Sequence, residues 1–519
     1  MLLHDLALGP GTAAAAHRDA ILTSDGGWSR DELRDTVHSM VPPLATLAPR
    51  GGRIAVAADG RPEVVGLLLA IPAAGRVAVP LNTRLTPDDL VAQLDAAGVA
   101  AIIGTAEELG RLAPVLGQAA TVKTSVGLDP GAGDISLAAL VAAPAPAAAV
   151  AEDAAAPAWV VFTSGTTGRP KGVVLTARSL GAAVATTAAA RPFADDDVYL
   201  YPFPLYHVSA YNVVHALHRG RPVVLPRRFD PAEITRLAAE HDVTVMSLAP
   251  TMLRRLLDHR AQAPDPTAAL AGLRTVAYGA APMAPTLLAE AHAALGVDFA
   301  QGYGMTELSG NAVFLSPEDH RRGLDGEEHL LAAAGRPGPG VELRLVAEDG
   351  SEVPTGTPGE ITVRGEQVCA GYWDEPQATT ELIRDGWLHT GDVGVLDGTG
   401  LLTVVDRAKD IIVSGGENIS SREVEDLVAQ HPAVDRVAVV GVPDDRWGEA
   451  VCAAVVLRPG TSDDRTNLTA EILALTGAHL AGFKRPKRLV FVDSLPVNAS
   501  GKVNKPDLRR RLAAGPQPY

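Results

Sequence analysis

Residues 158–176 read AWVVFTSGTTGRPKGVVLT. The apolar runs AWVVF and VVLT are typical of buried β-strands. The ten residues from Thr163 to Gly172 between them hold three glycines, four hydroxyl side chains and one lysine. Backbone N–H groups, hydroxyls and an ammonium group are suited to binding anionic oxygens. The stretch therefore predicts two strands joined by an anion-binding loop, and a solvated glycine-rich hairpin is the alternative interpretation.

The spacing within this loop excludes two common nucleotide-binding motifs. A Walker loop has the pattern G-x-x-x-x-G-K-[ST], but here Gly165 is followed by Gly168, and Lys171 is followed by Gly172. A dinucleotide fold has G-x-G-x-x-G directly after a strand, which is absent from the sequence. An ordinary phosphate-releasing NTPase and a nicotinamide enzyme are therefore disfavoured.

Composition narrows the class of protein further. The chain has 519 residues and a formal net charge of −16, which predicts about two to four domains and no nucleic-acid partner. The longest apolar stretch, residues 64–75, contains Pro72 and is shorter than the ~18–20 residues of a membrane span. The N-terminus has no basic region typical of a secretory signal. Two cysteines, Cys369 and Cys452, give no disulfide framework, so we expect a cytoplasmic protein.

The order of predicted elements indicates an α/β fold. Strand-like and helix-like stretches alternate before the loop, at 53–60, 61–75, 76–82, 87–98 and 99–104. This alternation predicts βαβ units and a parallel sheet. A second series follows the loop, with helices near 177–190, 232–240 and 252–259. The Ala/Pro-rich run 137–158 is predicted to be a surface connection.

The pattern changes twice in the last third of the chain. From Val341 short strands alternate with glycines, which predicts a β-rich subdomain, and after Asp406 the pattern is that of a small α+β domain. We predict a large N-terminal domain (1–405) of βαβ-type subdomains plus the β-rich subdomain. A hinge (406–410) and a small mobile α+β C-terminal domain (411–519) follow.

The loop resembles the signature loop of the acyl-adenylate-forming superfamily, which includes acyl-CoA synthetases, adenylation domains of peptide synthetases and luciferases. Further stretches resemble motifs of this family in the same order. They are PLYHV at 204–208, YGAAP at 278–282, QGYGMTE at 301–307, HTGDVG at 389–394, DRAKDIIVSGGENI at 406–419 and NASGKVNK at 498–505. A chance match to all of them in order is far rarer than a match to the loop alone.

The resemblance implies a ligase that works in two steps. A carboxylate reacts with ATP to give acyl-AMP and pyrophosphate, and a thiol then displaces AMP. The implied cofactors are ATP, Mg²⁺ and coenzyme A. Because two anions must meet in the first step, catalysis depends on positioning and on neutralising charge. Thr306 is expected to contact the α-phosphate, and Glu307 is expected to bind Mg²⁺, a hard cation that prefers oxygen ligands.

The resemblance also assigns the nucleotide site. The glycine-rich loop would hold the β- and γ-phosphates, and adenine would lie between YGAAP and QGY. Asp392 would accept hydrogen bonds from the ribose hydroxyls, and Arg407 would add a second polar contact. The expected ATP- and AMP-binding residues are Thr163, Ser164, Gly165, Thr166, Thr167, Gly168, Lys171, Gly279, Ala280, Ala281, Gln301, Gly302, Tyr303, Gly304, Thr306, Asp392, Arg407 and Lys502.

Lys502 is expected to bridge the carboxylate and the α-phosphate, and the expected catalytic set is Lys502, His207, Thr306 and Lys171. In the family the small domain rotates after adenylation, and Lys409 matches the hinge position. The rotation would bring SGGEN, with Gly416 and Glu417, to a tunnel for the pantetheine thiol of coenzyme A.

The acid is less well defined by the sequence. The expected acyl pocket consists of His207, Val208, Ser209, Tyr211, Thr251, Tyr278, Gly304, Leu308 and Ser309. His207 would gate or orient the carboxylate, or else be a packing histidine. Tyr278 stands where the family usually has Ser, Thr or Gly, and a ring pointing inward would favour a small or medium acid. Without an obvious buried cation near Gly302 for a second carboxylate, we expect a monocarboxylic acid, aliphatic or aromatic.

The acceptor of the acyl group is also implied by the resemblance. The intact SGGEN and the length of a single module resemble free-standing acyl-CoA synthetases, which favours coenzyme A over the phosphopantetheine arm of a carrier protein. A non-catalytic nucleotide-binding regulator is disfavoured because the expected functional residues are all present, namely Lys171, Thr306, Glu307, Asp392, Arg407 and Lys502. A homodimer is left open.

The hinge assignment leads to a first prediction. In Lys409→Pro the fixed proline φ would restrict rotation, so thioester formation is expected to fall more than acyl-AMP formation. Pyrophosphate release and thioester yield, measured side by side, check this. Equal losses in both would contradict a hinge at Lys409.

Overall fold

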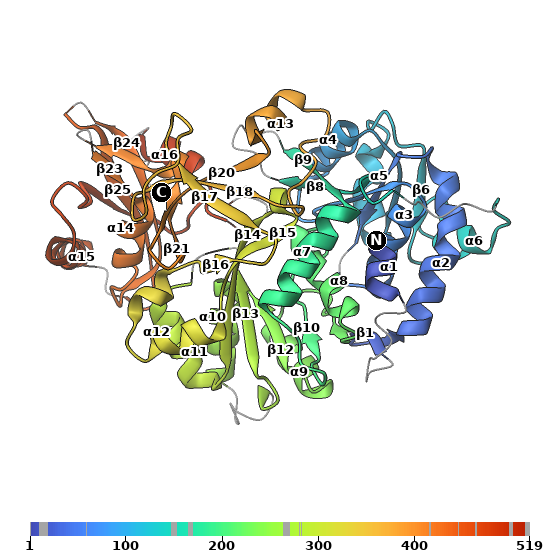
Figure 1. Ribbon diagram of the computed structural model, residues 1–519, viewed down its shortest axis with the longest axis horizontal. Coiled ribbons are helices and arrows are strands. Elements are labelled where there is room, and N and C mark those ends of the chain that lie inside the picture. The colour runs from blue at the N-terminus through green and yellow to red at the C-terminus, as the bar shows by residue number, and fades with distance from the viewer. Residues whose placement is uncertain are drawn as a thin grey trace. The chain divides into compact units, whose positions relative to one another are not determined.

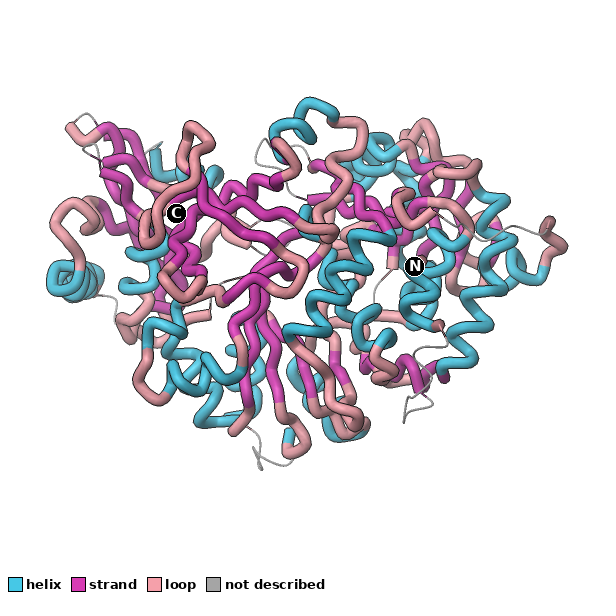
Figure 2. Tube along the Cα trace, viewed as in Figure 1, coloured by secondary structure: helices cyan, strands magenta, loops and turns pink. Residues whose placement is uncertain are grey.

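The computed structural model describes residues 2–9, 19–58, 60–146, 153–163, 170–262, 270–279, 281, 283–414, 417–444, 446–461, 464–497 and 502–513. They form two compact units. The first comprises Met1–Leu343 and Val363–Leu388, and the second comprises Arg344–Thr362 and His389–Tyr519. Figure 1 labels their helices and strands, and Figure 2 marks the strands in magenta.

The opening stretch forms the edge of a seven-stranded sheet in the first unit. The order is β7-β6-β5-β3-β4-β8-β9, and neighbours pair in parallel except for the antiparallel hairpin of β8 and β9. The strands are β3 (Arg53–Ala57), β4 (Val77–Pro80), β5 (Val99–Gly104), β6 (Thr124–Gly127), β7 (Ile135–Ser136), β8 (Pro157–Thr163) and β9 (Lys171–Thr176). The helices in this part of the chain are α3 (Pro62–Ala73), α4 (Pro87–Ala97), α5 (Ala106–Leu116) and α6 (Leu137–Ala142).

Local sequence explains where a helix such as α4 begins and ends. The Thr86 hydroxyl caps its first turn by accepting a hydrogen bond from the N–H of Asp89, and Gly98 ends it with a left-handed φ of 59°. Leu90 and Leu94 lie one turn apart on the buried face and pack into the core against β3 and β5.

The second sheet of this unit has nine strands in the order β16-β15-β14-β13-β12-β10-β11-β1-β2. Its strands are β1 (Asp19–Thr23), β2 (Gly26–Ser29), β10 (Tyr199–Leu200), β11 (Val223–Val224), β12 (Val245–Leu248), β13 (Thr275–Gly279), β14 (Asp298–Met305), β15 (Gly310–Leu315) and β16 (Arg336–Pro337). The associated helices are α1 (Leu3–Leu8), α2 (Arg30–Leu47), α7 (Ala177–Ala190), α8 (Tyr211–His218), α9 (Pro231–Glu240), α10 (Pro250–Ala261), α11 (Pro285–Leu295) and α12 (Pro317–Leu324). Figure 1 shows α10, α11 and α12 gathered beside β12, β13 and β14.

The remaining strands form two five-stranded sheets. One has the order β17-β18-β20-β19 with β21 paired to β20, and the other has the order β23-β22-β25-β24 with β26 paired to β25. The first contains β17 (Glu342–Val346), β18 (Gly359–Arg364), β19 (Ile383–Arg384), β20 (Trp387–Leu396) and β21 (Leu402–Arg407), with α13 (Pro376–Leu382) before β19. The second contains β22 (Ile412–Ser414), β23 (Glu417–Ile419), β24 (Val434–Asp444), β25 (Gly448–Leu457) and β26 (Arg488–Phe491), with α14 (Ser421–Val428), α15 (Arg465–His479) and α16 (Lys505–Ala513).

The predicted fold class is confirmed, and most helices lie where the periodicity places them. The run 137–158 differs from the prediction of a surface connection, because Leu137–Ala142 forms α6 and β8 begins at Pro157. Ser136 caps α6 by accepting a hydrogen bond from the N–H of Ala139, and Leu137 and Leu140 are buried. The Ala-rich run therefore contains a short capped helix that its composition does not reveal.

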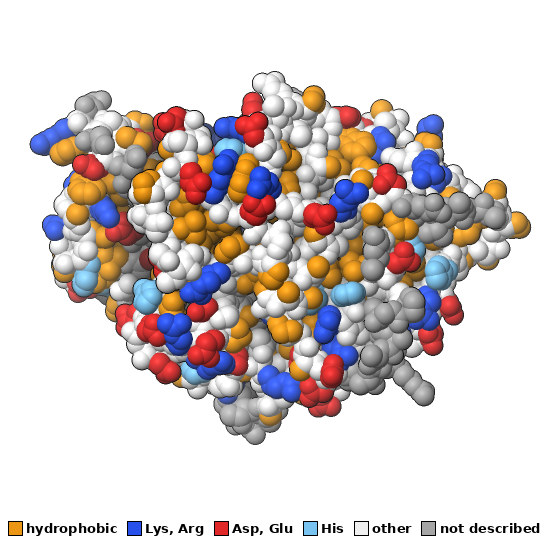
Figure 3. All heavy atoms as spheres, viewed as in Figure 1, with side chains coloured by type: hydrophobic (Ala, Val, Ile, Leu, Met, Phe, Trp, Pro, Cys, Tyr) orange, Lys and Arg blue, Asp and Glu red, His pale blue; other side chains and the backbone are white. Residues whose placement is uncertain are grey.

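The described part of the chain contains no helix long and apolar enough to cross a membrane. Acidic and basic side chains are intermixed on the face of the molecule in Figure 3. The predicted hinge contains the short 3₁₀ helix η6 (Ala408–Asp410), and its role as a hinge stays a prediction.

Gly335, directly before β16, generates a stability prediction. Gly335 has φ of +112°, and a Cβ added there would lie 1.9 Å from the carbonyl oxygen of Phe314. Gly335→Ala should therefore lower the free energy of unfolding by about 3 kcal/mol or more. Gly296, with φ of +65° and open space around it, is the control, and Gly296→Ala should cost about 1 kcal/mol. Urea unfolding followed by tryptophan fluorescence checks both, and equal costs would contradict the steric argument.

Candidate active site

The glycine-rich loop connects the two strands that the sequence predicts. Trp159 anchors β8, since its indole N–H donates to the carbonyl of Leu68 at 2.9 Å. Thr163 pairs with Lys171 across the hairpin, and its hydroxyl donates to the Lys171 carbonyl at 3.5 Å. Ser164, Gly165, Thr166, Thr167 and Gly168 lie outside the described residues.

Lys171 and Glu307 meet the same tyrosine. The Tyr372 hydroxyl donates a hydrogen bond to Oε1 of Glu307 at 2.9 Å, and the Lys171 ammonium lies 4.9 Å from the centroid of the Tyr372 ring. Glu307 is 6% exposed. Burial and the adjacent carboxylate raise the pKa of Tyr372 well above its ordinary value, so the phenol stays protonated and acts as a donor.

The motif QGYGMTE forms the end of β14 and the 3₁₀ helix η4 (Thr306–Leu308). β13 and β14 pair in parallel, with Gly279 opposite Gly302. A Cβ on Gly302 would lie 2.2 Å from the Asn311 amide, so any larger residue there would displace the Asn311 side chain. Thus Gly279 and the segment from Gln301 to Glu307 lie together. Ala281 is exposed.

Tyr278, Gln301 and His320 form a polar group within the core. The Tyr278 hydroxyl lies 3.1 Å from Gln301 Oε1 and 2.8 Å from His320 Nε2, and His320 Nδ1 lies 2.7 Å from the Ser316 carbonyl. Since that carbonyl can only accept, Nδ1 carries the proton, and the single Tyr278 hydroxyl hydrogen is shared between the Gln301 oxygen and His320 Nε2. His320 is 1% exposed, and burial lowers its pKa, which keeps the ring neutral.

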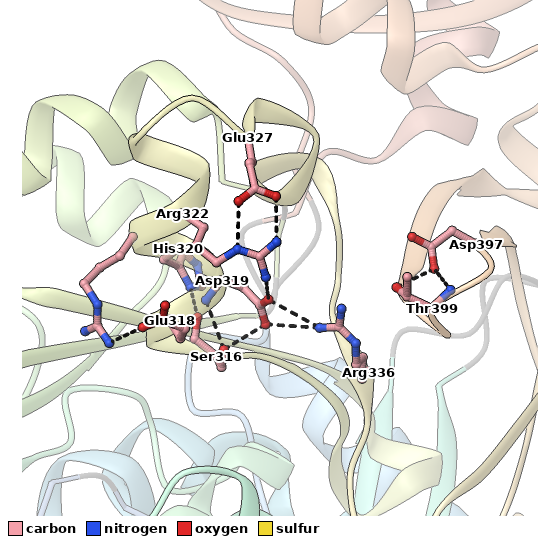
Figure 4. Close-up of polar contacts among 10 residues, drawn as sticks. Ser316, Glu318, Asp319, His320, Arg322, Glu327, Arg336, Asp397 and Thr399 are labelled. Carbon is pink, nitrogen blue, oxygen red and sulfur yellow. Dashed lines mark hydrogen bonds and ion pairs between the residues drawn. The ribbon is translucent and has the colours of Figure 1, made fainter.

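An ionic network on α12 lies next to this histidine (Figure 4). Asp319 accepts from the Ser316 hydroxyl at 2.8 Å and from Arg336 at 3.2 Å, while Arg322 pairs with Glu327 at 2.6 Å. The network fixes the first turn of α12 and with it His320. The assignment of Tyr278 to the acyl pocket stays a prediction, because the observed contacts of its ring are with the core residues Phe299 and His320.

Four of the nine expected acyl-pocket residues, His207, Val208, Ser209 and Tyr211, lie at the start of α8 or just before it. His207 precedes the 3₁₀ helix η2 (Val208–Ala210), and the Ser209 hydroxyl is 2.8 Å from that of Tyr201. Tyr211 is fully buried, with its hydroxyl 3.0 Å from that of Thr187. The other expected members of the pocket differ in their exposure to solvent and in backbone conformation. Thr251 is exposed, Leu308 is buried, and Ser309 has a left-handed φ of 55°.

The second unit brings Asp392 and Arg407 together. They are opposite each other on β20 and β21, and Arg407 Nε lies 3.0 Å from Asp392 Oδ1. Asp392 is buried, whereas the Arg407 side chain is 45% exposed. Two predicted nucleotide contacts that are fifteen positions apart in the sequence therefore form one ion pair.

The other predicted residues of this unit occupy separate elements. Lys409 lies in η6, and Glu417 begins β23, where it pairs with Ser414. Lys502 is exposed and precedes α16. Ala280 and Gly416 lie outside the described residues.

The donor set around Glu307 fits the implied Mg²⁺. Mg²⁺ keeps several waters and usually binds one or two carboxylates together with substrate phosphates. No cluster of three or more His, Cys, Asp or Glu side chains suited to a metal occurs in the described ranges. A single buried carboxylate next to Thr306 therefore matches a metal that arrives with the nucleotide.

Comparison with known families gives the identity of the fold. The family model described as "AMP-binding enzyme" matches residues 12–373, and the model described as "AMP-binding enzyme C-terminal domain" matches residues 423–502. The chain belongs to the AMP-binding enzyme family. The match includes the predicted phosphate loop, the adenine segment and Lys502.

Named relatives agree with this assignment. The medium/long-chain-fatty-acid–CoA ligase FadD8 of Mycobacterium tuberculosis is 41% identical over 360 residues, which are 69% of this chain and 61% of that protein. The feruloyl-CoA synthase of Amycolatopsis sp is 37% identical over 465 residues, 89% of each protein. The solved structure of the amide bond synthetase McbA from Marinactinospora thermotolerans has a TM-score of 0.87 and 32% identity, and the match covers 98% of this chain and 99% of that one.

These findings confirm the predicted superfamily and the enzyme class, an AMP-forming acyl-CoA synthetase with ATP, Mg²⁺ and coenzyme A as cofactors. Sequence reasoning missed Tyr372 and His320. The GYW sequence at 371–373 and the histidine in α12 carry no periodic or motif signal, and their partners Lys171 and Tyr278 lie far away in the sequence.

His320 generates a pH prediction. Its pKa is lowered in the folded protein from about 6.5, so below about pH 6.5 the unfolded chain binds more protons and stability falls as the pH falls. The slope is at most about 1.4 kcal/mol per pH unit for one group. Urea unfolding at pH 7.5 and 5.5 should show a smaller loss for His320→Gln, which can still accept from Tyr278.

The exposed His329 provides the control. His329→Gln should keep the pH dependence of the unmodified protein. Identical losses in His320→Gln and His329→Gln would contradict the buried neutral state of His320.

Proposed function

We propose that this protein activates a monocarboxylic acid as acyl-AMP and then transfers the acyl group to coenzyme A. The observation that carries the proposal is the convergence of Lys171 and Glu307 on Tyr372. A cation and a buried carboxylate from distant parts of the chain are thereby held at one end of the phosphate loop. This arrangement suits a polyphosphate bound together with a metal ion.

The residues of the first unit would act by positioning and charge. Lys171 would neutralise the β- and γ-phosphates as pyrophosphate leaves, together with the loop from Ser164 to Gly168. Thr306 would hold the α-phosphate. Glu307 would hold Mg²⁺, which when bound draws charge from the phosphate oxygens. Gly279 and the adjacent Gly302 would leave room for the flat adenine ring.

The residues of the second unit would bind the ribose and then act in the two steps of the reaction. The Asp392 carboxylate would accept hydrogen bonds from the ribose hydroxyls. Arg407 would hold this carboxylate in place through their ion pair. Lys502 would bridge the substrate carboxylate and the α-phosphate in the first step. Rotation at Lys409 would then exchange Lys502 for the hairpin that contains Gly416 and Glu417.

Coenzyme A as acceptor has support on the surface of the second unit. Trp447 is 38% exposed and Phe483 is 39% exposed. The Arg446 guanidinium lies 4.7 Å from the Trp447 ring centroid, and the Lys487 ammonium lies 5.8 Å from it while donating to the carbonyl of Gly482 at 3.0 Å. Exposed aromatic rings beside cations suit a nucleotide with phosphates, because bases stack on the rings and phosphates pair with the cations.

The acid itself is proposed by class. Apart from His207, the expected acyl-pocket residues are uncharged, which supports a monocarboxylic acid. Among the relatives, one is named for medium- and long-chain fatty acids and another for a feruloyl group. An aliphatic or aromatic acid is therefore proposed.

We also propose that the enzyme is cytoplasmic.

The alternatives differ in the acceptor or in the chemistry. A carrier protein presents the same phosphopantetheine thiol as coenzyme A. The similarity to an amide bond synthetase adds an amine as a further acceptor. A non-catalytic nucleotide-binding regulator would have the same nucleotide contacts without turnover.

Acid-dependent exchange of labelled pyrophosphate into ATP tests the proposal. Across a panel of carboxylic acids, a monocarboxylic acid should support exchange, and adding coenzyme A should give AMP and acyl-CoA in equal amounts by mass spectrometry. Lys502→Ala should slow exchange by about a hundredfold, whereas Lys123→Ala, at an exposed position of the first unit, should have no effect.

The other outcomes separate the alternatives. Transfer of the acyl group to a carrier protein or an amine, and not to coenzyme A, would overturn the proposed acceptor but not acyl-AMP formation. No exchange with any acid would favour the regulator, and undiminished exchange in Lys502→Ala would overturn the mechanism.

A further inference from the structure

Tyr372 lies in a segment that joins the phosphate-loop strand to the proposed metal ligand. The N–H of Cys369 donates to the carbonyl of Glu307 at 2.9 Å, and the N–H of Ala370 donates to Val174 at 3.0 Å. In turn, the N–H of Val174 donates to the carbonyl of Gly371 at 2.9 Å. One short segment is therefore hydrogen-bonded to both η4 and β9.

The next two residues complete the connection. Trp373 donates from its N–H to the carbonyl of Gly172 at 2.7 Å, and Tyr372 forms a β-bridge with Val173. The Tyr372 N–H donates to the Thr379 hydroxyl at 2.9 Å. Gly371 is required at the turn, because its φ is +119° and a Cβ would lie 2.3 Å from the Thr379 side chain.

The Tyr372 side chain uses this rigid position in two ways. Its hydroxyl donates to Oε1 of Glu307, and its ring face lies 4.9 Å from the Lys171 ammonium. A carboxylate can accept a hydrogen bond at one oxygen and bind a cation through the other. Cation–π attraction holds an ammonium without neutralising it.

We propose that Tyr372 is a positioning residue of the adenylation reaction, which orients Glu307 toward the metal–nucleotide complex and holds Lys171 at the phosphates. The inference rests on the proposed function of this site. The hydroxyl acts on the metal-dependent part of nucleotide binding, and the ring acts on the part that depends on Lys171. A merely structural role would not separate the two.

Two variants separate these contributions. Tyr372→Phe keeps the ring and loses the donor, so it should weaken ATP binding about tenfold with Mg²⁺ present and less than twofold in EDTA. Tyr372→Leu loses both and should weaken binding under both conditions. Isothermal titration calorimetry with ATP on the full chain measures these constants without turnover.

Tyr199→Phe is the matched control. Tyr199 is fully buried, and its hydroxyl lies 2.6 Å from that of Ser247 in the core, so this variant should bind ATP as the unmodified protein does. In a Glu307→Gln background, Tyr372→Phe should add less than a twofold loss, because the two residues act as one unit.

The outcomes that overturn the inference are distinct from those that overturn the function. If Tyr372→Phe binds ATP with Mg²⁺ as tightly as Tyr199→Phe, or loses affinity equally with Mg²⁺ and in EDTA, the positioning role is wrong. An unmodified protein whose ATP affinity does not depend on Mg²⁺ would contradict both this inference and the proposed function. Thermal unfolding midpoints confirm that the variants compared are folded.

Discussion

The central constraint on this protein is that two negatively charged reactants would have to approach each other. In the proposed mechanism one cation and one buried acid meet this constraint, and both contact the same phenol: Lys171 lies over the ring of Tyr372, and Glu307 accepts from its hydroxyl. Lys171 belongs to a hairpin in one sheet, Glu307 to the 3₁₀ helix that follows a strand of another, and Tyr372 to a segment that follows both in the sequence. Backbone hydrogen bonds hold the three in place, so the ring and the carboxylate have little freedom to reorient.

The βαβ pattern, the helix positions and the order of motifs could be predicted because they depend on local periodicity and on short runs of residues. The ion pair of Asp392 and Arg407 joins two residues that were each predicted, although their direct contact was not. The contacts of Tyr372 and His320 could not be predicted, because each depends on strands that meet only in the folded chain. The helix α6 was missed because an Ala-rich run has weak periodicity.

The second unit contains two kinds of surface with different chemistry. The pair on β20 and β21 is a buried carboxylate with a half-exposed arginine. Trp447 and Phe483 are exposed aromatic rings accompanied by cations. Since large exposed rings on a protein surface favour association with a partner or ligand, this region is where the proposed acceptor of the acyl group would bind.

The position of β1 has a consequence for biosynthesis. This strand pairs in parallel with β11, which leaves the ribosome about 200 residues later. At about 5–20 residues per second, the N-terminal hairpin waits on the order of ten to forty seconds for its neighbour. During that interval its edge is unprotected, and a chaperone that covers it would raise the yield of native enzyme in the cell.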